Sequence, residues 1–158
     1  MDSLTQALLG ANTFALIKNK SIGTTSLFIG ACVGTIPDLD VIFAPLFNEV
    51  AFISVHRSVT HSIFFAVLGS YFFAYIAHKM TASRHCFKNW FWAFFLALFT
   101  HSLLDCCTTY GTKILSPLNG YLFSFNSIHV FEPIYTSILL VGTACYLFKN
   151  INMDAKQK

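Results

Sequence analysis

Five apolar stretches, separated by short polar connections, constrain the fold of this chain most strongly. The clearest is residues 90–99, WFWAFFLALF, which contains no charged side chain. Charged residues make up only 11% of the sequence, less than half of the roughly 25% typical of soluble domains. A soluble domain of this length could not bury so much apolar surface. The sequence therefore predicts an all-α, polytopic membrane protein.

We expect about five transmembrane or membrane-embedded helices, at about residues 2–17, 22–36, 61–78, 89–107 and 132–148. They form a single helical membrane domain, 1–150, followed by a flexible polar tail, 151–158. A full span needs about 20 residues, so a re-entrant or interfacial pair is an alternative for the first two stretches. Small residues in both favour close packing as a helical hairpin. Thr60 or Ser58 is expected to cap the third helix.

The basic residues predict the orientation in the membrane. With the connections alternating between sides, eight of the ten basic residues fall on one side: Lys18, Lys20, Lys79, Arg84, Lys88, Lys149, Lys156 and Lys158. The positive-inside rule assigns that side to the cytoplasm. We therefore expect a multi-pass protein of the bacterial inner membrane, with the N-terminus outside and the C-terminus in the cytoplasm.

Acids and histidines gather on the opposite side, although they were not used to assign it. Six of the seven acids are expected there: Asp2, Asp38, Asp40, Glu49, Asp105 and Glu132. Four of the six histidines join them: His56, His61, His101 and His129. This gathering predicts a cation site at the outer boundary of the membrane.

The most specific polar pair is His101 and Asp105, at the end of the fourth apolar stretch. Residues four apart lie on the same helix face, and ionisable groups at membrane depth need partners or a metal. Asp38 and Asp40 are two residues apart, so in an extended segment both would point the same way and could grip one ion. The combined prediction is six ligands for one or two ions: Asp38, Asp40, His56, His61, His101 and Asp105.

Histidine and carboxylate ligands together suit zinc first, with manganese, iron or magnesium as alternatives. Each piece alone also has an ordinary structural explanation. Asp38 and Asp40 could cap a helix, and His56 and His61 could be satisfied interface side chains. Arg57 could hold a substrate phosphate or carboxylate through its planar fork, or pair with Asp38 or Glu49. Glu132 could simply favour a helix N-terminus, and the role of His129 is left open.

Two classes of site are disfavoured. None of the five cysteines forms a CxxC pair, which argues against a disulfide framework or a thiolate zinc site. The basic residues lie scattered at the ends of apolar segments, so no nucleic-acid partner is indicated, and membrane lipids are the expected surroundings. The sequence does not indicate an oligomeric state.

Several motifs also resemble a known group. MDSLTQALLGA, GTIPDLD, HRSVTHS, THSLLDCCTTYGT and FNSIHVFEPIYT are similar, in order and type, to motifs of membrane-bound metal-dependent hydrolases, some of which are labelled LexA-binding, inner-membrane-associated hydrolases. The resemblance covers residues 1–148. It implies a bacterial inner-membrane protein with a divalent metal held at Asp38, Asp40, His56, His61, His101 and Asp105. Further candidates from the motifs are Gln6, where some members have His, Thr108, and Glu132, where many have Asp.

Three functions follow as hypotheses. In a hydrolase, the metal lowers the pKa of a bound water, Asp38 or Asp40 acts as general base, and Arg57 orients an anionic substrate. A site at headgroup depth favours a lipid, an amphipathic ester or a phosphoester. The alternative is a non-catalytic protein that binds or transports divalent ions. In the third hypothesis the metal only staples the helices together.

Overall fold

In a computed structural model of the chain, the described residues are 1–46, 48, 56–81 and 86–155, without the side chains of 18–21 and 151–155. Within these ranges the chain forms α1 (Ser3–Ile22), α2 (Thr25–Thr35), η1 (Pro37–Leu46), η2 (Val59–His61), α4 (Ile63–Met80), α5 (Phe87–Cys106) and α6 (Pro133–Ala155), where η denotes a 3₁₀ helix. No strand occurs in these ranges, so the all-helical prediction is confirmed. The predictions that concern Glu49, Arg84 and residues 156–158 fall on residues outside the described ranges.

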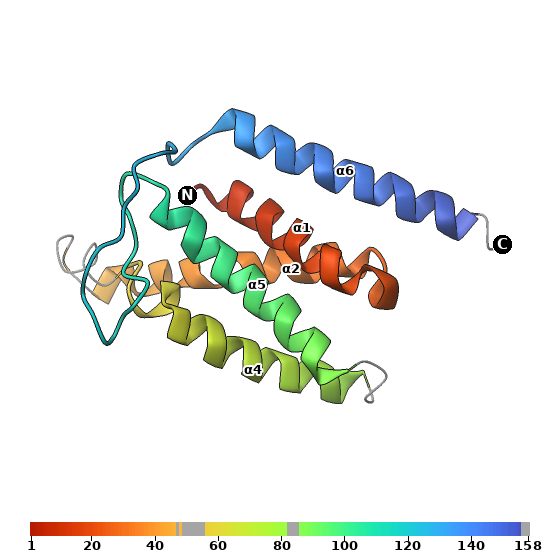
Figure 1. Cartoon of the computed structure of the whole chain (residues 1–158), viewed down its shortest axis with the longest axis horizontal. Coiled ribbons are helices and arrows are strands. Elements are labelled where there is room, and N and C mark those ends of the chain that lie inside the picture. The colour runs from red at the N-terminus through yellow and green to blue at the C-terminus, as the bar shows by residue number, and fades with distance from the viewer. Residues whose placement is uncertain (47, 49–55, 82–85, 156–158) are drawn as a thin grey trace.

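The helices are arranged so that one end of the molecule collects the polar motifs. Figure 1 shows the N-terminus, the end of α5 and the start of α6 at one end, and the C-terminus at the other. The two 3₁₀ helices lie at the same end as the N-terminus (Figure 1). Helix α6 lies on the outside of the bundle, along α1 (Figure 1).

The apolar core is built around α5. Its buried side chains Trp90, Phe94 and Leu98 form one cluster with Phe14 of α1. The ring of Phe94 lies 5.1 Å from that of Phe14 in an edge-to-face arrangement, and 5.7 Å from that of Phe73 of α4. Aromatic pairs at these separations add specific geometry to the packing. Helix α5 is thus fixed by contacts along its first three turns, before its polar end is reached.

Helices α1 and α2 approach each other at glycines. A Cβ atom added to Gly10 would lie 2.4 Å from the Gly30 carbonyl oxygen, and one added to Gly34 would lie 2.7 Å from the Gln6 carbonyl oxygen. Only glycine permits this backbone contact, as in the small-residue interfaces of membrane helices. The predicted hairpin of the first two helices is confirmed.

Large apolar side chains cover the outside of the bundle as well as its core. On α4, Leu68, Tyr71 and Phe72 are all exposed, and similar residues line α2, η1 and α6. Among the described helices, Thr25–Leu46 and Ile63–Met80 are long and apolar enough to cross a membrane, with mean hydropathies of 1.7 and 1.4. An outer surface this apolar suits contact with lipid tails rather than water.

Three details differ from the sequence predictions. Helix α4 is capped by Ser62, whose Oγ accepts a hydrogen bond from Phe65 N at 3.1 Å, and not by Thr60 or Ser58. Thr60 lies inside η2, two residues before the cap position, and its hydroxyl contacts Asp40 and His61 instead. Helix α6 continues to Ala155 instead of ending near 148. The segment after Pro37, expected to be extended, is the 3₁₀ helix η1.

The long connection between α5 and α6 folds back over the polar end of the bundle. Thr112 and Phe123 exchange two backbone hydrogen bonds of 2.9 and 3.0 Å. Phe125 N donates to the Cys106 carbonyl, and Ile63 N, at the start of α4, donates to the Ile114 carbonyl. These bonds tie the connection to both α4 and α5 beside the polar motifs.

Candidate metal centre

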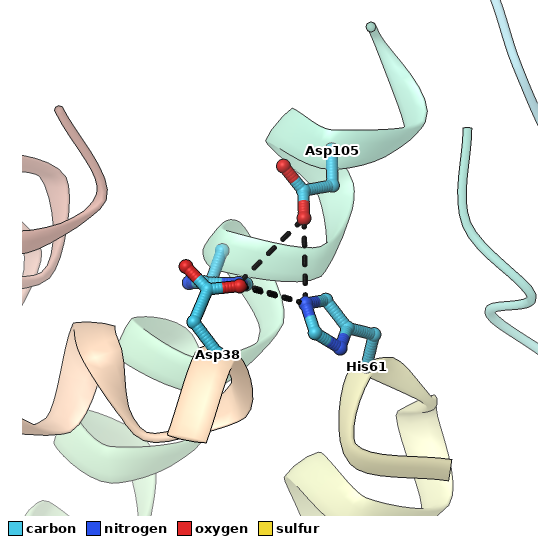
Figure 2. Close-up of side chains that lie close together, drawn as sticks. Asp38, His61 and Asp105 are labelled. Atoms are coloured by element: carbon cyan, nitrogen blue, oxygen red, sulfur yellow. Dashed lines mark hydrogen bonds and ion pairs between the residues drawn. The ribbon is translucent and has the colours of Figure 1, made fainter. Parts of the chain in front are cut away.

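Four of the predicted ligands come together at the polar end of the bundle. Asp38 lies on η1, His61 on η2, and His101 and Asp105 one turn apart on α5. One ligand atom from each lies within 4.8 Å of all the others. Figure 2 shows Asp38, His61 and Asp105 pointing toward one another from their three elements.

The separations between these atoms match a small four-coordinate ion. His61 Nε2 lies 3.2 Å from Asp38 Oδ1, 3.4 Å from Asp105 Oδ2 and 3.2 Å from His101 Nε2. His101 Nε2 lies 3.5 Å from Asp38 Oδ1 and 3.7 Å from Asp105 Oδ2. A tetrahedral zinc with bonds of about 2.0–2.1 Å would hold its ligand atoms about 3.3 Å apart.

Hydrogen bonds on the far side of His101 fix which nitrogen faces the cluster. Its Nδ1 lies 2.6 Å from the carbonyl oxygen of Gly34, on α2. A carbonyl can only accept, so Nδ1 carries the proton and donates. In the neutral ring, Nε2 therefore presents a lone pair to Asp38, His61 and Asp105, as metal-binding histidines do.

The tautomer of His61 is fixed by the same reasoning, through Thr60. The Thr60 hydroxyl donates its only proton to Asp40 Oδ2 at 2.9 Å. It can then only accept from His61 Nδ1, which lies 3.1 Å away. The neutral His61 ring therefore also turns a lone pair toward the cluster. Two imidazole lone pairs and two carboxylate oxygens converge with no donor hydrogen among them, an arrangement that calls for a cation.

The carboxylate of Asp105 is fully buried and held from one side only. Its Oδ1 accepts from Gln6 Nε2 at 3.0 Å and contacts the Met1 amino group. Its Oδ2 makes no hydrogen bond and faces the two imidazoles. An unsatisfied buried carboxylate oxygen is costly, and coordination to a cation would offset that cost.

A proton can take the place of the cation on His61. Burial by itself lowers the pKa of this imidazole, but hydrogen bonds and charge attraction from Asp105 and Asp38 outweigh it, so the pKa lies above its usual value. The acids thus stabilise a positive charge at this point whether it is a proton or a metal ion. A metal ion requires the deprotonated ring.

Two predicted ligands, Asp40 and His56, lie outside the cluster. Asp40 accepts from Thr60 through Oδ2 and bonds His56 Nδ1 through Oδ1 at 2.8 Å. The prediction that Asp38 and Asp40 grip the same ion assumed an extended segment, and the described geometry does not bring Asp40 into the cluster. In a 3₁₀ helix, residues two apart point about 120° away from each other. Asp40 therefore lies behind His61, where it supports the ring instead of facing an ion.

The other sequence candidates surround the cluster without joining it. Arg57 Nε lies 3.8 Å from Asp105 Oδ2, and Thr108 Oγ1 donates to the Asp105 carbonyl. Gln6 donates to Asp105, and Glu132 is not among the clustered residues.

Sequence reasoning missed the roles of Thr60 and the Gly34 carbonyl. Thr60 could have been found from its place beside His61, but a backbone carbonyl leaves no signal in the side chains.

Comparison with known proteins agrees with the membrane character of these helices. A family model described as YdjM inner membrane protein matches residues 1–157. The chain belongs to the YdjM inner membrane protein family. This membership supports the predicted inner-membrane location.

One curated relative shares part of the chain. It is the uncharacterized protein YfhP of Bacillus subtilis (strain 168), which is 28% identical over 97 residues. The match covers 61% of this chain and 29% of the Bacillus protein, so the chain spans well under half of that relative. No solved structure matches the chain.

Proposed function

We propose that this protein is a membrane-embedded, metal-dependent hydrolase whose divalent ion is held by Asp38, His61, His101 and Asp105. The observation that carries this proposal is the convergence of two carboxylate oxygens and two imidazole nitrogens within 4.8 Å of one another, with both neutral rings turning lone pairs toward the cluster. Zinc is the first choice because two imidazoles and two carboxylates suit it, with manganese and magnesium as alternatives.

The exposure of the cluster favours a catalytic ion over a structural one. His61, His101 and Asp105 are buried, whereas the Asp38 side chain is 22% exposed. Structural zinc sites are closed by four protein ligands, while a catalytic ion needs a coordination position for water, which with four protein ligands requires expansion to five-coordinate on an exposed side. The exposed side of this cluster is the side on which Asp38 lies.

In the proposed reaction the bound ion and the side chains of the protein have different roles. When bound, a divalent ion supplies a water of lowered pKa and polarises a carbonyl or phosphoryl oxygen. Asp38 Oδ2 makes no hydrogen bond with the described residues, since Asp38 pairs with the histidines through Oδ1. This free oxygen is suited to accept a proton from an attacking water. Asp40, held by His56 and Thr60, keeps His61 in its ligating tautomer instead of acting as the base.

Topology forms part of the same proposal. All five α-helices cross or enter the inner membrane, with the N-terminus outside and the C-terminus in the cytoplasm. The uneven distribution of basic residues supports this orientation, as does the gathering of the polar motifs at one end of the bundle (Figure 1). The ion then lies at the outer membrane boundary, within reach of amphipathic esters or phosphoesters.

The alternative is a non-catalytic protein that binds or transports divalent ions. Transport needs a polar path toward the other face. Below the cluster, however, α5 is packed with the buried rings of Trp90 and Phe94 and with Leu98, against Phe14. This apolar packing favours a site that ions and ligands enter and leave from the polar end of the bundle alone.

The test is metal-dependent hydrolysis by purified protein in lipid nanodiscs, with p-nitrophenyl phosphate and p-nitrophenyl butyrate as probes. We expect turnover with zinc or manganese that chelation abolishes, and its loss in Asp105→Asn and His101→Gln. Lys88→Gln, which removes a charge from the start of α5, serves as the control and should behave as the parent protein. Equal turnover in the parent protein and Asp105→Asn would contradict the proposal.

A further inference from the structure

Arg57 lies beside the candidate metal centre with hydrogen-bonding capacity to spare. Its side chain is only 15% exposed, and Nε lies 3.8 Å from Asp105 Oδ2. Nη1 donates to Thr108 Oγ1 at 3.3 Å, and the guanidinium lies 5.5 Å from the centre of the Tyr110 ring. Nη2 makes no hydrogen bond within the described residues. A largely buried guanidinium with an unused donor edge is suited to bind an oxyanion in a bidentate manner.

The backbone at Arg57 is held in a costly conformation. Its φ of +60° is in the left-handed region, which residues other than glycine seldom adopt. The surrounding structure maintains it, because Lys113 N donates to the Arg57 carbonyl at 3.0 Å. Strain of this kind persists where the surroundings impose it, and it gathers at ligand-binding positions. Here it keeps the guanidinium next to Asp105.

A pocket of about 430 Å³ shares Tyr110 with the surroundings of Arg57. It is lined by Thr109, Tyr110, His129, Val130 and Phe131. Tyr110 belongs to both features, because its ring packs under Arg57 and also forms a wall of the pocket. The side chains of Thr109, Tyr110 and His129 make no hydrogen bonds with the described residues, and none of the lining residues is acidic. The volume is within the range of small-molecule sites.

The net charge around the candidate metal centre determines which class of ligand can bind beside it. With a divalent ion in place, Asp38, Asp40 and Asp105 contribute three negative charges, the ion two positive ones, and Arg57 and the Met1 amino group one each. The outcome is one net positive charge in a partly buried site, which favours an anionic ligand.

We propose that Arg57 and this pocket form a subsite for the phosphoryl group of a phosphoester, and that phosphoesters are the substrate class. The inference rests on the proposed function, because it names the substrate of the same centre. A phosphoryl group offers three terminal acceptor oxygens. The potential donors here are the two N–H groups of the Arg57 fork and the polar groups of Tyr110 and His129. A phosphate monoester carries close to two negative charges near pH 7 and a carboxylate only one, so a site with net positive charge favours the phosphoryl group.

The experiment measures binding of inorganic phosphate to the protein in nanodiscs by calorimetry, with metal content determined on the same samples. We expect Arg57→Gln to weaken phosphate binding by about tenfold or more, since it removes charge-assisted hydrogen bonds. Arg57→Lys should recover only part of the affinity because it keeps the charge without the fork. Metal content should equal that of the parent protein in both. Lys88→Gln, the matched loss of one positive charge, should bind phosphate as the parent does.

Two further arms separate the possible sources of the phosphoryl group. Nanodiscs containing phosphatidic acid should compete with phosphate if the substrate is a lipid, whereas glycerol 3-phosphate should compete if it is a soluble ester. Either result supports the subsite. Unchanged phosphate binding by metal-loaded Arg57→Gln, or acetate binding as tight as phosphate, would overturn it. A parent protein without metal would contradict the proposed function instead, and its phosphate affinity with and without Arg57 would still test the subsite.

Discussion

The two halves of α5 have the same helical backbone and similar burial but opposite chemistry. In the first half, Trp90, Phe94 and Leu98 are buried against apolar side chains of α1 and α4. In the second, His101 and Asp105 are just as buried, but their neighbours are Gln6, Asp38, His61 and a backbone carbonyl. The apolar half requires only that neighbouring side chains fit closely around it. The polar half requires hydrogen-bonding and charged atoms at specific positions.

The difference explains why helices pack so closely around the polar half. The carbonyl of Gly34 can reach His101 because α1 and α2 meet at glycines, with no side chain between the two backbones. The apolar half should therefore tolerate changes of shape at a cost in stability alone. The polar half should lose ion binding whenever the positions of its partners shift. Substitutions in each half can test this separation.

Gly34→Ala should have the largest effect. The new methyl group would lie 2.7 Å from the Gln6 carbonyl and force α1 and α2 apart. Overpacking of this kind costs about 1–3 kcal/mol, and the displaced Gly34 carbonyl would no longer orient His101. We expect lower stability together with weaker metal binding, measured by thermal unfolding and by chelator competition.

Gly69→Ala provides the control for that change. It makes the same substitution inside a helix, but its methyl group would lie 3.4 Å from Leu98 Cδ1, an ordinary contact. Stability and metal affinity should both stay close to those of the parent protein. If Gly34→Ala behaved as Gly69→Ala does, the packing of α1 on α2 would not be what positions the centre.

Leu98→Ala should have an intermediate effect, confined to stability. Leu98 is fully buried in the core, so its loss leaves a cavity between α4 and α5. We expect a cost of about 2 kcal/mol, the low end for such a change, because lipid tails are as apolar as the core. Metal stoichiometry should not change. Loss of bound metal at an unchanged unfolding temperature would show that the two halves are not independent.

Thr60→Val should have the smallest effect and act on the centre alone. Valine has the shape of threonine but cannot accept the hydrogen bond from His61 Nδ1 or donate to Asp40. Removing such a supporting group typically weakens metal binding by about tenfold or more. Thr60→Ser keeps the hydroxyl and should restore the affinity, which chelator competition would measure. Equal affinity in the Val and Ser variants would exclude this role for the hydroxyl.

The sequence predicted the helices well because their signal is carried by many residues at once. Each apolar stretch corresponds to an α-helix, and the pairing of α1 with α2 followed from their small residues. His101 and Asp105 were recognisable because polar groups four residues apart are conspicuous in an apolar helix. For this pair, both the spacing in the sequence and the energetic cost of placing ionisable groups in an apolar helix indicated a site.

The sequence could not predict the details that depend on local backbone geometry. Asp38 and Asp40 point in different directions because the segment is a 3₁₀ helix, and periodicity over so few residues does not separate that from an extended chain. Ser62 caps α4 because the helix begins at Ile63, a boundary that depends on where η2 ends. The Gly34 carbonyl could not be foreseen as a partner of His101, since its position depends on how three helices pack.

The most direct test of the centre is X-ray absorption spectroscopy of the purified, metal-loaded protein at the metal edge. The account predicts one ion per chain with only nitrogen and oxygen neighbours, two imidazole rings among them, at about 2.0–2.1 Å if the ion is zinc. The Asp105→Asn variant should bind the ion at least 100-fold more weakly. Sulfur neighbours at about 2.3 Å, from Cys106 or Cys107, or a parent protein with no stoichiometric metal, would contradict the central claim.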